Sequence, residues 1–488
     1  MLKLRQITLL STLHLLDSRL RFALLPAFIF VFQSGLWAQP DFTKTFGPAG
    51  ITGISVVQNP DKGFTFCGNI SPTNNFFTSV KVLVIRTDSL GSELWRKSFG
   101  RNDLNYNYKI VRTRDGGYAI GGYSQPQNSN YQQDMLLLRL KANGDSLWGK
   151  SYGQPSTSSE IAFDLIETSD KGFLLAGESA PSVLEYMHLV KTDSLGNTQW
   201  IKSPMSNYLD HRALTVKENP FGGFIVGGNT GSPIKALSVV RLDDEGNTLW
   251  AKRYSRGQFT PRPEDVVSLP DSGFLMVATV PLNANSTLAN SWLLRLKSNG
   301  DTIKTKTFKN VRIRSIVQDN NGGFWLAGVR PGFDPISYLY KVNAQGDSLW
   351  GKEYSFYPII RVEEANPTQD GGLIMVGSAL ENNEGKAILI KTDSLGNVPV
   401  PVSVSLPVPG LGELSLYPNP AGEELVLNSE IEAEMELSVF NVLGKSMIRI
   451  PSATGLRQRI PVATLPAGMY RLQVKTEKGT TLIPFQKL

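Results

Sequence analysis

Four ionisable residues recur at one position of a repeated pattern. Asp164, Asp265, Glu364 and Lys109 each lie eight residues before a glycine that follows a turn. Two carboxylates on either side of a glycosidic bond can serve as acid and base, whereas carboxylates beside a lysine can bind a cation or a sugar. The other three repeats carry hydroxyl groups there: Ser55, Thr215 and Ser315. These seven residues, the polar ring, predict either a hydrated channel or a ligand site.

Histidine and cysteine are too scarce to support much other chemistry. The chain has three His and one Cys, Cys67. A single thiol excludes an internal disulfide framework and a site with several thiolate ligands. His188 lies in an apolar segment and is expected to pack, whereas His211 is expected in a connecting loop, where it could contact a ligand. We find no nucleotide-binding loop, zinc pattern or nucleophile elbow, and we predict neither a cofactor nor a metal.

The polar ring belongs to a unit that occurs seven times. A turn residue and Gly precede an aromatic residue or Leu, as in Asp115-Gly-Gly-Tyr118, and the last Gly recurs at steps of 49 to 55 residues. A second turn follows, as in Thr87-Asp-Ser-Leu-Gly91, and a Trp comes shortly after it in five copies. The fifth copy has Lys304 in that place. A repeat of about 50 residues indicates a solenoid or a propeller.

Apolar runs between these turns predict four antiparallel strands per unit. We therefore predict an all-β fold in which residues 39–400 form a seven-bladed β-propeller. The seventh copy lacks a fourth strand, and residues 42–47 resemble the fourth strand of the first copy, so they are expected to complete the last blade and remove the open edges. An open solenoid of meanders is the alternative. The Asp-containing turns lack the alternating oxygen ligands of a calcium loop and are interpreted as hairpins.

Variable connections on one face are the expected binding surface. The two turns of each unit are uniform, whereas the other connections vary in length and composition, and variable loops on a rigid scaffold commonly carry function. The candidates there are Tyr106, His211, Arg262 and Asp334.

The first 38 residues read as a secretory signal. Lys3, Arg5, Arg19 and Arg21 precede an apolar run that begins at Phe22, and cleavage is expected after Ala38. An uncleaved anchor helix is the alternative. Without this segment the chain keeps 45 basic and 42 acidic residues, a net charge of +3. Nucleic acid is therefore an unlikely class of partner.

A Pro-rich linker, 401–412, leads to a small predicted Ig-like β-sandwich over 413–488. Four separated features occur there in order: a Tyr-Pro-Asn-Pro start, an Asn-x-x-Gly-Lys hairpin, a Gly-x-Tyr strand and a Lys near the end. Their residues are Pro418, Asn419, Pro420, Gly444, Lys445, Gly468, Tyr470 and Lys487. This segment resembles the type A C-terminal sorting domain of the type IX (Por) secretion system of Bacteroidetes. An ordinary Ig-like binding module is the alternative.

The resemblance implies a route. It implies Sec export to the periplasm, recognition by the outer-membrane translocon and processing by a sortase-like enzyme. The protein would then be released or attached to the cell surface. The propeller is expected to be a monomeric binding or scaffold protein without catalysis, with a glycan or protein ligand. The alternative is an extracellular polysaccharide hydrolase or lyase that uses the ring carboxylates.

Overall fold

The computed structural model describes residues 41–487, with internal gaps. The gaps are 48–49, 72–79, 101–103, 126–131, 154–157, 182–183, 233, 284–287, 331–335, 355–359, 382–383, 399–405, 409–411, 418–420, 431, 442–443 and 467. The predicted signal segment therefore lies outside the described residues. Among those that are described, no helix is long and apolar enough to cross a membrane.

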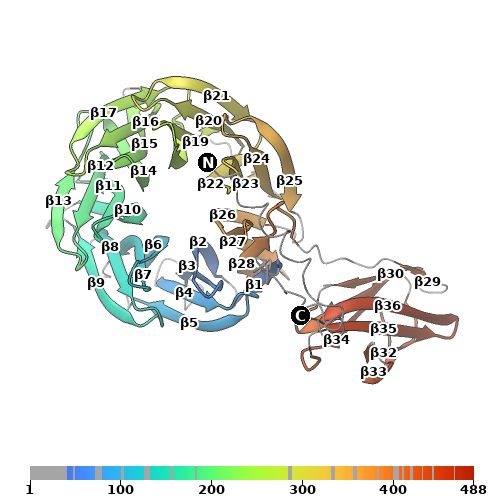
Figure 1. The fold of residues 1–488 in the computed structure, drawn as a ribbon. Helices are drawn as coiled ribbons and strands as arrows, with labels where there is room; N and C mark the ends of the chain where they lie inside the picture. Colours follow the sequence, from blue (N-terminus) through green and yellow to red (C-terminus); the bar gives the residue numbers. More distant parts are fainter. Residues whose placement is uncertain are drawn as a thin grey trace, which may run out of the picture. The chain divides into compact units, whose positions relative to one another are not determined.

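The described chain is all-β and forms nine four-stranded antiparallel sheets. Seven of them come from residues 42–392, and Figure 1 shows these arranged in a ring. Six consist of consecutive strands. The first two are β2 (Thr52–Gln58), β3 (Phe64–Ile70), β4 (Lys81–Thr87), β5 (Glu93–Phe99); and β6 (Leu104–Arg112), β7 (Tyr118–Gln125), β8 (Asp134–Leu140), β9 (Ser146–Tyr152).

The next four sheets repeat this order around the ring. They are β10 (Ser159–Glu167), β11 (Phe173–Ala180), β12 (Tyr186–Thr192), β13 (Thr198–Lys202); β14 (Leu209–Glu218), β15 (Phe224–Ser232), β16 (Ala236–Leu242), β17 (Thr248–Tyr254); β18 (Arg262–Ser268), β19 (Phe274–Pro281), β20 (Ala289–Leu296), β21 (Thr302–Phe308); and β22 (Arg312–Gln318), β23 (Phe324–Arg330), β24 (Ile336–Val342), β25 (Ser348–Tyr354).

The seventh sheet joins the two ends of the ring. It contains β26 (Ile360–Pro367), β27 (Leu373–Glu381), β28 (Glu384–Thr392) and, as its outer strand, β1 (Phe42–Phe46). Phe42 pairs with Lys391 and Phe46 with Ala387. The innermost strands of neighbouring sheets contact one another around the whole circuit, including β2 with β26. The fold is therefore a closed β-propeller, which leaves no open edge between its first and last strands.

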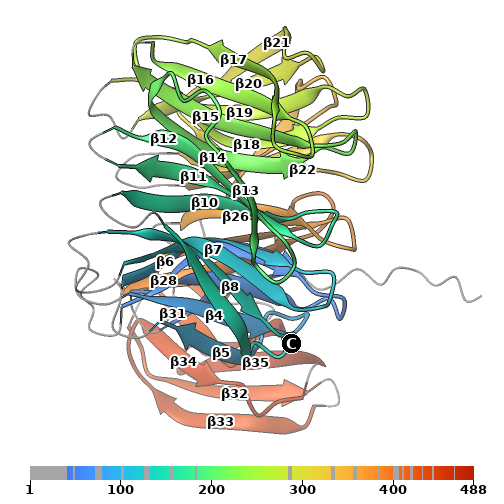
Figure 2. The ribbon, with the colours of Figure 1, turned by 90° about the vertical axis from the view of Figure 1, so that its left-hand side faces the viewer.

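The first strand of every unit is innermost, and the fourth is at the rim (Figure 1). Seen from the side, the strands cross from one face of the ring to the other (Figure 2). The turns from first to second strand and from third to fourth strand therefore share one face, which we call the turn face. The remaining connections lie on the opposite face, which we call the loop face.

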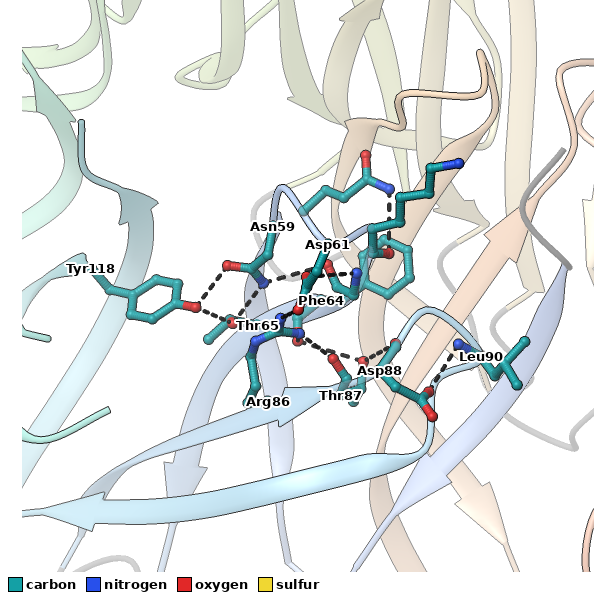
Figure 3. A network of polar contacts seen from close by, with 12 residues as sticks. Asn59, Asp61, Phe64, Thr65, Arg86, Thr87, Asp88, Leu90 and Tyr118 are labelled. Carbon is teal, nitrogen blue, oxygen red and sulfur yellow. Dashed lines mark hydrogen bonds and ion pairs between the residues drawn. The ribbon is translucent and has the colours of Figure 1, made fainter. Parts of the chain in front are cut away.

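A cation on the third strand holds the first turn of each unit. In the first unit Arg86 of β4 is paired with Asp61 and donates to the carbonyl of Phe64 (Figure 3). Arg or Lys pairs with the turn Asp in five further units, as Lys391 does with Asp370 at 2.8 Å. In the fourth unit Arg241 donates to backbone carbonyls instead. Five of these seven cations are buried, and each satisfies its charge on a turn carboxylate, on backbone carbonyls or on both.

The repeated Trp lies over the second turn of the following unit. A Cβ added to Gly144 would lie 2.5 Å from the ring of Trp95, and one added to Gly196 would lie 2.7 Å from that of Trp148. Phe42 covers Gly91 in the same way across the closure. Glycine therefore serves two needs at this turn: a positive φ and close approach of the aromatic ring.

Residues 406–487 form two further sheets that face each other across an apolar core, in agreement with the predicted sandwich. One has the order β29 (Leu406–Val408), β30 (Gly412–Tyr417), β31 (Glu424–Ser429), β34 (Arg457–Pro461). The other has β33 (Ser446–Ala453), β32 (Met435–Asn441), β35 (Gly468–Thr476), β36 (Gly479–Lys487). Leu416, Leu427, Leu437 and Leu472 are buried in the core. Part of the predicted linker is thus a strand, because Leu406–Val408 pairs with β30.

Candidate binding site in the central channel

The polar ring lies at one level of the innermost strands, immediately after a β-bulge. The register shifts between Ala162 and Asp164, between Pro263 and Asp265, and at the corresponding point of the other five strands. A bulge leaves a residue unpaired and disturbs the ladder next to it. Six of the seven ring residues, all but Ser55, line a cavity of about 310 Å³. The ring residues therefore lie on the innermost strands, where the sequence placed them.

The ring carboxylates bind the backbone next to the bulges. Asp164 accepts from the amide of Leu165 at 2.9 Å and from that of Val216, in the next unit, at 2.8 Å. Asp265 accepts in the same way from Val266 and Ile316, both at 2.9 Å. Each carboxylate thereby satisfies buried N–H donors and ties one unit to the next.

Other ring residues make the same link with different groups. Ser55 accepts from the amide of Ile110 at 3.1 Å, and Ser315 donates to the carbonyl of Ala365 at 3.0 Å. Glu364 closes the circuit, accepting from the amide of Val56 at 3.1 Å. The ring is therefore part of the architecture that joins neighbouring units.

Two lysines pair with the three ring carboxylates and balance most of their charge. Lys109 is paired with Glu364, and Lys217, two residues beyond the ring, lies 3.2 Å from Asp265 and 3.9 Å from Asp164. Burial opposes the charge of Lys109, but Glu364 and the ring aspartates outweigh it, so its pKa lies above the ordinary value. The same balance, with Asp265 the strongest carboxylate, raises the pKa of Lys217. Both lysines therefore remain charged at neutral pH.

Four aromatic side chains pack together on the second and third units, and two of them reach the cavity. Tyr106 stacks on Tyr123 with ring centroids 5.1 Å apart, and Tyr108 meets Phe163 edge to face at 5.4 Å. Tyr108 and Phe163 are the bulged residues of β6 and β10, and both line the cavity. We call these four residues the aromatic wall. Tyr106 was expected in a connection, but it lies within β6.

Arginines occur on other units of the propeller. Three residues before the ring, toward the loop face, four consecutive units carry an arginine: Arg212, Arg262, Arg312 and Arg361. We call these the arginine arc. The repeats show this recurrence of arginine in the sequence. Only Arg262 was predicted as a candidate, in a connection, and it is the first residue of β18. About three residues of strand, roughly 10 Å, separate the arc from the ring.

Glutamates partly neutralise the arginines of these units. Arg212 binds Glu185 and lies 2.6 Å from Glu178. Burial raises the pKa of Glu178 to about 7, although Arg212 opposes the shift. Further round, Arg314 donates to Glu264 at 3.0 Å and lies 3.4 Å from Glu363. Arg314 and Glu363, like Glu264, are bulged residues that line the cavity.

Two other candidates do not join the site. His211 was expected in a loop, and this is wrong: it lies in β14, is fully buried and bonds Ser238 Oγ at 2.9 Å. Burial lowers its pKa to about 4, so it is neutral and inaccessible to a ligand. Asp334 lies outside the described residues. Within the part of the chain that is described, no group of three or more His, Cys, Asp or Glu could hold a metal ion.

The sorting-motif residues lie at the turns and edges of the C-terminal sandwich. Gly444 has φ 77° in the hairpin before β33, and Lys445 donates its amide to Asn441. Tyr470 follows Gly468 in β35, donates to the carbonyl of Pro466 at 2.8 Å and stacks on Phe485. Lys487 ends β36 and bridges to Ala421. The residues of the Pro418-Asn419-Pro420 start lie outside the described part.

Known structures resemble the chain only distantly, and no curated protein matches it. A protein of unknown function from Bacteroides caccae is 14% identical, with a TM-score of 0.38, covering 57% of this chain and 90% of that one. YCF48 from Cyanidioschyzon merolae is 10% identical, with a TM-score of 0.42, covering 71% of this chain and 98% of that one. A sialidase of Trypanosoma rangeli is 9% identical, with a TM-score of 0.38, covering 88% of this chain and 83% of that one. Such likenesses say nothing of activity.

The C-terminal sandwich has a definite match. Residues 415–485 match the family described as the secretion system C-terminal sorting domain. This agrees with the resemblance carried by the Asn-x-x-Gly-Lys hairpin and the Gly-x-Tyr strand, and it favours a sorting role over that of an ordinary binding module. The chain is thus a β-propeller that carries a type IX C-terminal sorting domain, which marks it for secretion with a secreted or cell-surface fate.

Proposed function

We propose that the mature protein is a non-catalytic binding propeller that acts outside the outer membrane. A signal peptide would take it through Sec to the periplasm, and the sorting domain would then engage the type IX translocon and its sortase-like enzyme. The proposed site is the cavity lined by Arg262 and six residues of the polar ring, and Tyr106 lies close to it on β6. We expect an extracellular glycan or protein as ligand and a monomeric state.

The observation that carries this proposal is the state of the ring carboxylates. A glycosidase needs one carboxylic acid that can donate a proton and one carboxylate that is available to substrate or water. Asp164 and Asp265 each use both oxygens on backbone amides, and Glu364 uses one on an amide and one on Lys109. These bonds hold the carboxylates against the strand backbones, where they join neighbouring units. The arrangement therefore favours binding over the hydrolase or lyase alternative.

Binding and turnover are tested together. The purified full-length protein is applied to an array of extracellular polysaccharides and proteins, and the bound polysaccharides are then assayed for shortened products. We expect binding without cleavage. Cleavage that is abolished by Asp265→Asn but not by a substitution of equal cost to stability would refute the binding-only proposal.

The export route has its own test. Deletion of 413–488 should leave the propeller in the periplasm, because the translocon would have nothing to recognise. The control is the variant Arg449→Gln, which changes an exposed side chain of the same domain. Normal surface delivery of the deletion variant would contradict the proposed role of the domain.

A further inference from the structure

The channel mouth combines features that no other part of the described surface brings together. The cavity of about 310 Å³ has aromatic side chains on one side, arginines and glutamates on the other and hydroxyl, lysine and carboxylate groups beneath. That volume is at the lower end of the range of small-ligand sites. A cavity of this volume can hold one end of a chain-like ligand, and the remainder of the ligand would extend toward the loop face.

Unused hydrogen-bonding capacity lies at the bottom of this cavity. Thr215 is the ring residue of the fourth unit, with 2% of its surface exposed, and it lines the cavity. Its hydroxyl oxygen has no hydrogen-bond partner among the described residues. Its counterparts Ser55 and Ser315 both form a hydrogen bond to the backbone of the next unit. In the unit that follows Thr215 the corresponding amide is that of Val266, and it already donates to Asp265. A buried hydroxyl without a partner costs free energy, so rotation of this side chain toward a ligand oxygen in the cavity would be favourable.

One arginine at the rim remains open to a ligand, although the cavity lining as a whole has five carboxylates and four basic groups. The carboxylates are already bound, Glu264 and Glu363 by Arg314, and Asp164, Asp265 and Glu364 by amides and lysines. Arg262 differs, because its side chain is 53% exposed and its nearest carboxylate, Glu264, is 4.0 Å away.

The next arginine of the arc adds to the positive charge near Arg262. Burial and the neighbouring guanidinium of Arg314 lower the pKa of Arg312, so like charges crowd this side of the mouth. A planar guanidinium binds a carboxylate through two parallel hydrogen bonds. An anionic group with the geometry of a carboxylate therefore fits the position of Arg262.

We propose that this cavity binds the end of an acidic saccharide. The sugar carboxylate meets Arg262, the apolar face of the sugar ring packs on Tyr108 and Phe163, and a sugar hydroxyl bonds Thr215. The inference rests on the proposed binding function and specifies the ligand for that site. An acidic peptide offers the carboxylate as well. It lacks the apolar face of a sugar ring that would pack on Tyr108 and Phe163.

The test compares each acidic saccharide with its carboxyl-reduced form. The probes are trigalacturonate, trimannuronate, a hyaluronan tetrasaccharide and sialyllactose, each titrated into the full-length protein by calorimetry beside its reduced counterpart and hexaglutamate. At least one acidic probe should bind about tenfold more tightly than its reduced form. Arg262→Gln should remove that preference. Thr215→Val, which keeps the shape, should weaken binding of both forms about fivefold.

The matched control is Arg459→Gln in the sorting domain. It removes an arginine that is 57% exposed and paired with a glutamate at 3.2 Å, so it repeats the change in charge far along the chain from the site. Its affinity for the probe should equal that of the unmodified protein. Thermal unfolding of each variant shows whether a loss of binding reflects a loss of fold.

The outcomes separate this inference from the proposed function. Equal affinity for acidic and reduced forms, an unchanged preference in Arg262→Gln, or stronger binding of hexaglutamate would overturn the acidic-saccharide assignment while a binding propeller stands. Absence of binding to all saccharide probes would overturn it too, and the polysaccharide and protein array would then decide the broader proposal. Cleavage of a probe would instead refute the non-catalytic function.

Discussion

Two turn glycines with nearly equal backbone angles should respond very differently to the same substitution. Gly144, in the second turn of its unit, has φ +81°, and Gly116, in the first turn, has φ +89°. A Cβ at Gly144 would lie 2.5 Å from the ring of Trp95, whereas one at Gly116 would meet nothing within 4 Å. Alanine at the two positions therefore separates the cost of the backbone conformation from the cost of displacing the ring.

The expected difference follows from these contacts. An alanine in the left-handed region costs about 1–2 kcal/mol, and both variants bear this cost. Only Gly144→Ala must also move an indole that packs between two units, which adds about 1–3 kcal/mol, as overpacking of a core does. Gly144→Ala should therefore lower the free energy of unfolding by about 2–5 kcal/mol, and Gly116→Ala by about 1–2 kcal/mol.

Unfolding of both variants in guanidinium measures the two costs. The signal is circular dichroism, because Gly144→Ala would also change the fluorescence of a Trp. A double-mutant cycle is completed with the variant Trp95→Ala and with Trp95→Ala combined with Gly144→Ala. Without the indole, alanine at 144 should cost no more than alanine at 116. Equal losses in the two single variants, or an undiminished cost in the Trp95→Ala background, would refute the reasoning.

Three further predictions concern the same contacts. Lys304→Trp should change the free energy of unfolding by less than about 1 kcal/mol, because Leu293 already covers Gly346 and the exposed pair with Asp347 is lost; a clear rise in stability in guanidinium would contradict this. Asp265→Ala should lower it by about 2–6 kcal/mol, since two buried amides lose their acceptor, and Asp265→Asn, which keeps one acceptor, should cost less. Burial lowers the pKa of His211 from 6.5 to about 4, so only the unfolded chain takes up its proton over that range. The stability that neutral His211 provides is complete above pH 6.5 and is lost as the pH falls toward 4, by about 3 kcal/mol at most. In His211→Asn the free energy of unfolding should decline less between pH 7 and pH 4.5, and an unchanged decline would count against this.

The repeats made the architecture predictable from the chain alone. A glycine recurs every 49 to 55 residues because a Cβ at that position would lie 2.0–2.8 Å from a backbone carbonyl oxygen of the third strand in every unit. The pattern of a single strand predicts little, but the same pattern repeated in seven units predicts the strand with certainty enough to define the fold. The pairing of β1 with β28 could be anticipated for the same reason, since Thr43–Gly47 repeats the pattern of a fourth strand.

The binding site could be predicted from the sequence only in part. The ring positions could be located, but the β-bulge before each of them leaves no mark in the composition, and it is the bulge that gives Asp164 and Asp265 two amides to bind. His211 was misplaced because the strand β14 begins earlier than its polar sequence suggests. The aromatic wall combines residues from β6, β7 and β10, whose proximity only the ring of sheets determines.

The repeats also allow structural and functional positions to be distinguished within one sequence. At the first turn, Lys62, Lys171 and Ser272 adopt a positive φ where other units have glycine, so that conformation alone does not require glycine. At the second turn all seven units have glycine, and there the neighbouring unit packs directly on it. Positions that closure requires are therefore uniform. The arginine arc has the opposite distribution: arginine in four adjacent units and Thr52, Tyr106 and Ile161 in the other three. A closed ring has no need of such asymmetry, whereas a ligand that must enter the channel with one charged side does.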